Sequence, residues 1–206
     1  MNAVVLLFRA CVTEQCIPKI WKTATVVALH KKGSVHCANN YRPVSLTCIL
    51  CKVYEKLLRE YILEGVRLSV SSKQHGFTQG RSCLSNLLET IDTVNDLMAE
   101  GHCADIFYFD FSKAFDSVPH NRLLVKLRSF GIPDTVVNII EIFLVGRSMR
   151  VKVGDEFSDV KTILSGVPQG SVLGPLLFLL FVNDLPNGIK NVVKLFADDV
   201  RSVFEL

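Results

Sequence analysis

The chain has 206 residues, of which 49% are hydrophobic and 21% charged, and its formal net charge is +3. These values are typical of one globular domain, or of a domain with a smaller lobe, and exclude a highly charged disordered segment. The most apolar run, residues 172–182, is only 11 residues long. A membrane-spanning helix needs about 20 residues. We therefore expect no membrane association through a span, and no signal peptide, because the first residues lack a basic lead-in.

The charges and the cysteines are informative about the partner and the compartment. Residues 1–45 contain six basic residues against Glu14, a net charge of +5, so the remaining residues sum to −2. A basic segment fits a phosphate-bearing partner, with a solvated basic face as the alternative. Seven cysteines, an odd number, indicate reduced thiols, an intracellular protein and no disulfide-linked partner. Cys48 and Cys51 lack a second ligand pair, so we interpret them as buried thiols.

The sequence predicts helices and strands that follow one another in mixed order along the chain. Hydrophobic spacing, β-branched residues and Gly or Pro breaks predict the following elements in chain order. These are a helix in 2–13, a strand in 23–30, a turn at 31–33, an extended segment in 41–46, and helices in 50–63 and 84–101. They continue with a strand of buried composition in 105–111, helices in 121–130 and 133–144, strands in 149–153 and 160–164, a helix in 171–183, and a hairpin of 192–196 with 200–204. Without a regular βαβ alternation, this order predicts an α+β fold with a mainly antiparallel sheet.

Two acidic features stand out against their apolar surroundings. Asp110 lies among aromatic residues in the predicted strand, and Asp198 and Asp199 lie at the bend of the predicted hairpin. A carboxylate in an apolar strand is costly unless it is paired or binds a metal, and adjacent like charges repel unless a cation is near. If the hairpin pairs beside the Asp110 strand, these carboxylates converge. Converging carboxylates suit two Mg²⁺ ions and an in-line phosphoryl transfer. A solvated acidic turn is the alternative.

Five segments together resemble a known family. They are IPKIWKTATVVALHKKG with NYRPVSL (17–33 and 40–46), QHGFTQGR (74–81), FDFSKAFD (109–116), SGVPQGSVLGP (165–175) and FADD (196–199). In this order and spacing, the chain resembles a reverse transcriptase domain of the non-LTR retrotransposon (LINE-type) branch. The resemblance covers essentially the whole chain. It implies an RNA-directed DNA polymerase that uses an RNA template, a DNA primer and deoxynucleoside triphosphates.

The resemblance also implies a metal site. Asp110 and Asp198 would be the main metal ligands, with Asp199 as the third carboxylate, holding two Mg²⁺ ions or Mn²⁺ as a substitute. The backbone around Phe111 would contribute at the same site. Asp105 lies five positions before Asp110, and we expect it on the other face of the strand or at its start.

Further residues match the family's nucleotide-binding positions. The resemblance implies that Arg42 contacts the incoming triphosphate, helped by Lys31 or Lys32, and an arginine fork suits phosphate oxygens. Gln169 and Gly170 match a loop that touches the nucleotide and the template, with Gly170 permitting close backbone approach.

Two residues after the Asp110 strand leave alternatives open. Phe115 matches an aromatic residue that blocks a ribose 2′-hydroxyl, and a core aromatic is an equally weighted interpretation. Asp116 follows it, and we expect it to cap the next segment rather than bind metal.

The resemblance implies a right-hand polymerase fold without its thumb. Residues 1–80 would form the fingers, and residues 81–206 the palm, with a fingers excursion around 118–165 and an end just after the catalytic hairpin. Because the thumb is not among these residues, an inactive retroelement remnant that folds or weakly binds nucleic acid is the alternative function. A group II intron maturase, or an enzyme that makes RNA, is a third interpretation.

Overall fold

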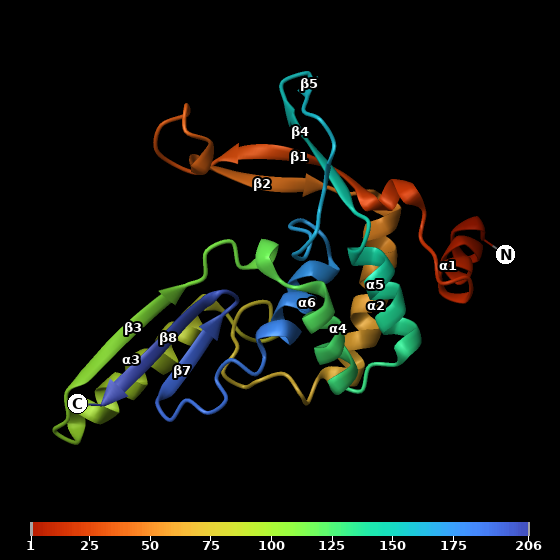
Figure 1. Ribbon diagram of the computed structural model, residues 1–206. Coiled ribbons are helices and arrows are strands. Elements are labelled where there is room, and N and C mark those ends of the chain that lie inside the picture. Colours follow the sequence, from red (N-terminus) through yellow and green to blue (C-terminus); the bar gives the residue numbers. More distant parts are fainter. Residues whose placement is uncertain (1, 206) are drawn as a thin grey trace.

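The computed structural model describes residues 2–205, which form two separate β-sheets around a group of helices (Figure 1). The helices are α1 (Ala3–Thr13), α2 (Ile49–Val66), α3 (Cys83–Ala99), α4 (His120–Ser129), α5 (Asp134–Leu144) and α6 (Leu173–Val182). The strands are β1 (Thr23–His30), β2 (Tyr41–Leu46), β3 (Ala104–Asp110), β4 (Ser148–Val153), β5 (Glu156–Phe157), β6 (Lys161–Thr162), β7 (Val192–Phe196) and β8 (Asp199–Glu205). Short 3-10 helices cover Lys19–Lys22, Ala38–Asn40 and Phe115–Ser117.

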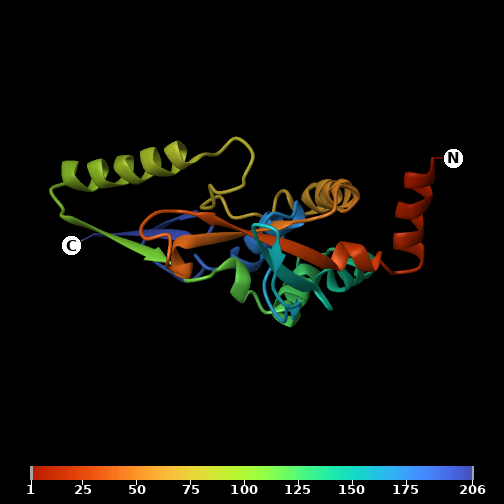
Figure 2. The ribbon, with the colours of Figure 1, turned by 90° about the horizontal axis from the view of Figure 1, so that it is seen from above.

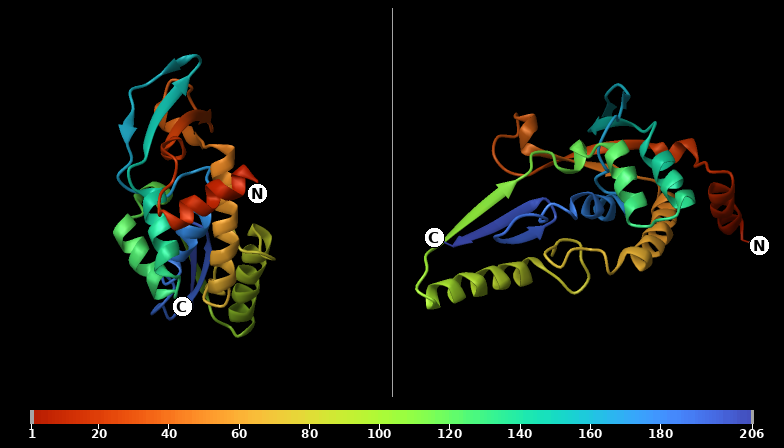
Figure 3. Two further views of the ribbon diagram at one scale, coloured as in Figure 1. Left: turned by 90° about the vertical axis from the view of Figure 1, so that its right-hand side faces the viewer. Right: turned by 60° about the horizontal axis from the view of Figure 1, so that its bottom comes forward.

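The smaller, three-stranded sheet has the order β3-β8-β7, and both strand pairs are antiparallel. Strand β8 lies between the other two because the predicted β7–β8 hairpin pairs along β3, which meets the condition for the aspartates to converge. Helix α3 runs along this sheet, on one side of it (Figures 2 and 3). The sheet therefore projects from the helical core and is covered by a single helix.

The larger, five-stranded sheet has the order β2-β1-β4-β5, with β6 paired to β4. Strands β1 and β4 are parallel, whereas the remaining pairs are antiparallel. This arrangement joins residues 23–46 to residues 148–162. With five of its six strand pairings antiparallel, the molecule fits the expected α+β class.

The hydrophobic core lies between helices α2, α4, α5 and α6. Helix α6 is buried along most of its length, as expected for the apolar sequence LGPLLFLLFV. Its proline, Pro175, is the third helical residue, where the missing N–H costs little. Helix α1 joins this core through an aromatic group in which Phe8, Trp21 and Tyr54 contact one another.

The structure confirms most of the predicted elements and corrects three. Residues 105–111 were expected to be a buried strand, but β3 is largely exposed because it lies at the sheet edge and pairs only with β8. The predicted strand in 160–164 is reduced to the two residues of β6. Strand β5 was not predicted, since two residues are too short to produce a periodic pattern.

The thiols and the helix lengths bear on two further expectations. All seven cysteines are unpaired, and Cys51 is buried, where its thiol donates to the Glu55 carboxylate at 3.4 Å. Cys48 is only partly buried. Among residues 2–205, no helix combines the length and the apolar character that crossing a membrane requires.

Candidate active site

The predicted acidic residues meet at one end of the three-stranded sheet. Asp110 is the last residue of β3, and it lies directly opposite Asp199, the first residue of β8. Residues opposite each other in an antiparallel pair project from the same face, with Cβ atoms about 5 Å apart. Asp198 precedes Asp199 in the two-residue turn that joins β7 to β8. Asp105 is five residues from Asp110, so it projects from the opposite face.

Burial and the neighbouring carboxylates disturb the ionisation of Asp199. Desolvation, followed by the charges of Asp198 and Asp110, raises the pKa of Asp199, and Arg201 only partly opposes this. The site therefore carries excess negative charge that a bound cation would relieve. Among residues 2–205, no group of three His, Cys, Asp or Glu side chains is placed to hold a metal ion by itself. Mg²⁺ is commonly held by one or two carboxylates plus substrate phosphates, so this open acidic pair fits it.

The segment after β3 is joined by hydrogen bonds to the loop before α6. The Val167 N–H donates to the Phe115 carbonyl at 2.8 Å, and the Gly166 N–H donates to the Val118 carbonyl at 2.8 Å. A Cβ at Gly166 would lie 2.6 Å from the carbonyl oxygen of Asp116, and its φ of +89° also favours glycine. This loop thus requires a glycine where it meets the segment after β3.

Asp116 has a partner that the sequence did not reveal. Its Oδ1 accepts a hydrogen bond of 3.1 Å from Nε2 of Gln169, one of the predicted nucleotide-binding residues. Asp116, in the segment after β3, therefore orients Gln169, which lies in the loop before α6.

The two phenylalanines of this segment differ in burial. Phe115 is partly buried and stacks on Phe178 of α6, with ring centroids 4.3 Å apart. Phe111 follows the end of β3 and is exposed. The stacking holds the Phe115 ring in a fixed orientation while leaving part of it accessible, so both interpretations of Phe115 remain predictions.

The same loop also contacts the five-stranded sheet. The Ser45 N–H in β2 donates to the Gln169 carbonyl at 3.2 Å. A Cβ at Gly170 would lie 2.7 Å from the Ser45 carbonyl oxygen, and φ at Gly170 is +96°. Gly170 therefore permits a close approach of this loop to the Ser45 backbone, and its predicted contact with a nucleotide stays a prediction. Through its contact with Ser45 the loop bridges the two sheets.

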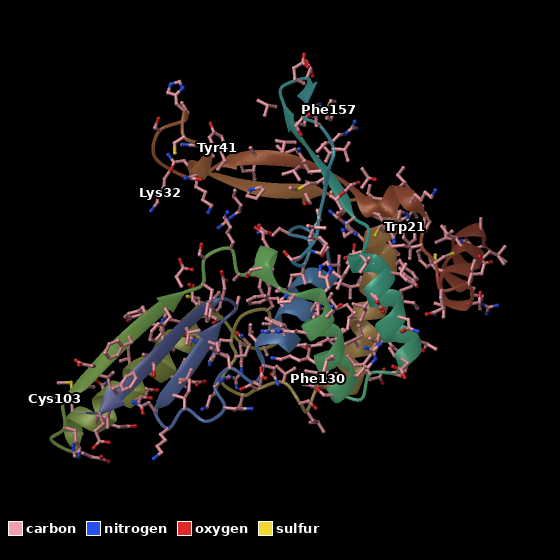
Figure 4. All side chains as sticks on the ribbon, viewed as in Figure 1. Trp21, Lys32, Tyr41, Cys103, Phe130 and Phe157 are labelled. Atoms are coloured by element: carbon pink, nitrogen blue, oxygen red, sulfur yellow. The ribbon has the colours of Figure 1, made fainter. Side chains whose placement is uncertain are left out.

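The predicted triphosphate-binding cations lie on the five-stranded sheet. Lys31 and Lys32 follow β1 at the outer end of its hairpin with β2, where Figure 4 labels Lys32. Arg42 lies on β2 opposite Leu29, and all three cations are exposed. None of them forms an ion pair with another residue in 2–205. They are free to bind an anion, but the structure does not bring them into contact with the carboxylates.

A family profile described as reverse transcriptase (RNA-dependent DNA polymerase) matches residues 29–205. The chain belongs to the reverse transcriptase family. The family motifs at 109–116, 165–175 and 196–199 all fall within the matched range.

Several similar sequences within the reverse transcriptase family come from mobile elements. The RNA-directed DNA polymerase from mobile element jockey of Drosophila melanogaster is 32% identical over 184 residues, covering 88% of this chain and 20% of that protein. The jockey polymerase of Drosophila funebris is 32% identical over 207 residues, covering 95% of this chain and 22% of that protein. These relatives confirm the predicted non-LTR retrotransposon resemblance. The chain spans only about a fifth of their length.

A solved structure supports the reverse transcriptase fold. Apo telomerase from Candida tropicalis, truncated from its C-terminal domain, aligns with a TM-score of 0.65 at 12% identity. The alignment covers 96% of this chain and 48% of telomerase. At this identity the likeness concerns the fold, and it confirms the expected α+β polymerase architecture.

One supporting residue of this candidate site was missed in the sequence. Glu55 of α2 is fully buried, and its Oε2 accepts hydrogen bonds from Val172 N at 2.7 Å and Leu173 N at 3.0 Å. A carboxylate at a helix N-terminus satisfies unpaired N–H groups and interacts favourably with the helix dipole. Glu55 therefore fixes the start of α6 and the loop that precedes it. A buried Glu in an otherwise apolar helix face was the available signal.

Proposed function

We propose that this chain is the catalytic segment of an RNA-directed DNA polymerase of a non-LTR retrotransposon. It would add deoxynucleotides to the 3′-hydroxyl of a DNA primer, directed by an RNA template. The observation that carries the proposal is the register of Asp110 opposite Asp199, with Asp198 beside them in the turn. Membership of the reverse transcriptase family supports the same reaction.

The three aspartates are proposed as ligands of divalent metal ions. The pKa of Asp199, raised by burial and then by the charges of Asp198 and Asp110, supports this role, because a cation would favour the ionised carboxylate. Mg²⁺ is the proposed metal, as two ions, with Mn²⁺ as a substitute. When bound, such ions would supply charge neutralisation at the phosphates and a lowered pKa of the attacking hydroxyl.

The nucleotide is proposed to lie between the aspartates and the loop before α6. Gln169, oriented by Asp116, would contact it from this loop, together with the backbone of Gly170. Phe115, held by its stacking on Phe178, would limit space at the ribose 2′ position. The backbone at Phe111 would complete the site beside Asp110.

The cations of the five-stranded sheet are proposed to bind the triphosphate. Arg42 supplies a planar fork for phosphate oxygens, and Lys31 or Lys32 adds a point charge. Their exposure, and the lack of an ion pair with any other residue in 2–205, support this role. In this assignment residues 1–80 are fingers, residues 81–206 are palm, and residues 118–165 include the fingers excursion whose strand β4 pairs with β1. We further propose an intracellular location.

Primer extension with an Asp110→Asn variant tests the proposed function. Neutralising this carboxylate should reduce template-directed incorporation by about 10³-fold or more. The free energy of unfolding should change by less than about 0.5 kcal/mol because Asp110 is exposed. Asp105→Asn is the matched control, since Asp105 lies on the same strand and the opposite face. It should retain incorporation.

The assay should be run on the 206-residue chain and on a full-length polymerase that contains it. Incorporation retained by Asp110→Asn in the full-length polymerase would contradict the assignment. Incorporation by the 206-residue chain itself would reject the inactive-remnant alternative. A smaller residue in place of Phe115 should relax the choice of sugar, and unchanged selectivity would remove its proposed role.

A further inference from the structure

The segment QHGF, residues 74–77, has no assigned role, yet it contacts the turn that carries the aspartates. Its backbone runs parallel to β7: His75 N donates to the Leu195 carbonyl at 2.9 Å, and Leu195 N donates to the Lys73 carbonyl at 2.9 Å. This pairing brings residues 74–76 into contact with Ala197, the first residue of the turn.

Ala197 has an unusual backbone conformation. Its φ is +56°, in the left-handed region that favours glycine, and the residue is buried. In a two-residue hairpin turn, the N–H of the first turn residue has no partner in the strand ladder. A buried N–H without an acceptor is costly. The turn before Asp198 and Asp199 therefore needs support from outside the hairpin.

Gln74 supplies that acceptor. Its side chain is 2% exposed, and its Oε1 accepts hydrogen bonds from Ala197 N at 2.9 Å and from Gly76 N at 2.8 Å. Because both partners are N–H donors, the atom facing them must be the amide oxygen. One buried oxygen thus joins the QHGF segment to the turn that carries Asp198.

Gly76 allows this approach. A Cβ at Gly76 would lie 2.3 Å from the Ala197 nitrogen, a distance that side chains essentially never reach, and 3.0 Å from the Ala197 Cα. Asn86 of α3 strengthens the same attachment, since its Nδ2 donates to the Leu195 carbonyl at 3.1 Å and its Oδ1 accepts from Arg201 at 2.8 Å. The turn is therefore held from both the loop and the helix.

We propose that Gln74 is a positioning residue for the metal-binding aspartates. It fixes the left-handed backbone of Ala197 through the Ala197 N–H, and so sets the direction in which Asp198 and Asp199 leave the turn. This inference rests on the proposed function for its consequence, but the attachment itself can be measured without catalysis.

The experiment compares Gln74→Met, which has similar size and no amide oxygen, with Gln79→Met as the matched control. Gln79 is exposed and lies in the same loop. Hydrogen exchange of the Ala197 amide is followed by NMR, and Mn²⁺ binding is followed by the EPR signal of the free ion. In Gln74→Met, exchange at Ala197 should accelerate by about tenfold or more, and the Kd for Mn²⁺ should rise about tenfold. Gln79→Met should change neither.

A rescue variant separates positioning from general stability. Ala197→Gly, added to Gln74→Met, removes the strain of the positive φ and should recover most of the Mn²⁺ affinity. Recovery of Mn²⁺ affinity beyond any gain in the free energy of unfolding distinguishes positioning from general destabilisation. If Gln74→Met does not fold, Gln74→Asn tests the same contact, because its shorter side chain cannot reach both donors while keeping an amide in the site.

The outcomes separate this inference from the proposed function. Unchanged Ala197 exchange in Gln74→Met, or faster exchange with unchanged Mn²⁺ affinity, would overturn the role of Gln74. Failure of the double variant to recover affinity would also overturn it. Absence of Mn²⁺ binding to the unsubstituted chain, or binding unaffected by Asp110→Asn, would instead contradict the proposed metal site, whatever the exchange rates show.

Discussion

The acidic end of the three-stranded sheet and the basic end of the five-stranded sheet differ in how their side chains are held. The aspartates lie on paired strands and a turn that buried Gln74 and Asn86 attach to the rest of the chain. Lys31, Lys32 and Arg42 lie on an exposed hairpin, with no ion pair to other residues in 2–205. One charged region is fixed by buried hydrogen bonds, whereas the other is free to adjust.

The difference matches the chemistry proposed for each region. Metal ligands must be held close to one productive geometry, and loss of their supporting partners typically weakens metal affinity about 10- to 100-fold. Long cationic side chains can follow a phosphate group as it binds, so they need less support. The two regions meet at the loop before α6, which hydrogen-bonds both to the segment after β3 and to Ser45 of β2.

The substitution with the largest expected effect tests whether the loop before α6 connects the two regions. Glu55→Ala would leave the N–H groups of Val172 and Leu173 without their buried acceptor. We expect the free energy of unfolding to fall by about 3 kcal/mol, measured by urea denaturation. Glu60→Ala on the same helix is the control. It removes only an exposed 3.9 Å ion pair with Lys56 and should cost less than about 0.5 kcal/mol.

A loss below about 1 kcal/mol for Glu55→Ala would mean that the start of α6 is held by packing alone. The two regions would then be joined through the hydrophobic core rather than through this loop. A fall of about 3 kcal/mol in the free energy of unfolding, accompanied by weaker nucleotide binding, would show that this loop sets the position of Gln169 as well as the stability of the core.

Much of the acidic site follows from local sequence rules. Alternation along a strand separates Asp110 from Asp105, and two apolar runs around Asp198 predict a hairpin. These rules act over a few residues, so they were reliable. The exposure of β3 was not predictable, because its aromatic composition is the same whether the strand lies at the centre or at the edge of a sheet.

The supporting contacts were hidden for a different reason. Gln74 and Ala197 are 123 positions apart, and Glu55 and Val172 are 117 positions apart. No periodicity connects such positions. Their joining depends on how the sheets and helices pack. Glu55 at least interrupts an apolar helix face, whereas Gln74, in a loop, looks like any other polar residue until that packing is known.

In the basic region, a substitution should change nucleotide binding and leave the free energy of unfolding unchanged. Arg42→Gln removes an exposed guanidinium proposed to bind the triphosphate, so the KM for deoxynucleotides should rise about tenfold in primer extension. The free energy of unfolding should stay within about 0.5 kcal/mol of the unsubstituted value. The KM of Arg42→Lys should lie between those of the unsubstituted chain and Arg42→Gln, since lysine keeps the charge but loses the planar fork.

Arg122→Gln on α4 is the control, because Arg122 is also exposed and lies on a different element. An equal rise in KM for this variant would show that the effect arises from total charge rather than from Arg42. A large loss of stability in Arg42→Gln would contradict the view that this region is held loosely.

The smallest expected effect is a pH dependence in the supports of the acidic region. His75 is buried between the loop and α3: its Nε2 lies 3.1 Å from Arg81 Nη1 and 3.4 Å from the Glu89 carboxylate. Ser85 Oγ donates to the Ser82 carbonyl, so it accepts from Nδ1 of His75 at 2.9 Å. The neutral ring therefore carries its proton on Nδ1 and accepts from Arg81 at Nε2.

Burial lowers the pKa of His75, as do the charges of Arg81 and Lys194, while Glu89 opposes them. The unfolded chain then takes up a proton before the folded chain does. Stability should accordingly fall as the pH drops below about 6.5, by at most about 1.4 kcal/mol per pH unit, and level off below the folded pKa. His75→Asn should remove this slope, whereas His36→Gln in the exposed hairpin loop should keep it. An identical slope in His75→Asn would mean that acid weakens the molecule elsewhere. The buried supports of the aspartates would then be no more sensitive to acid than the exposed basic region.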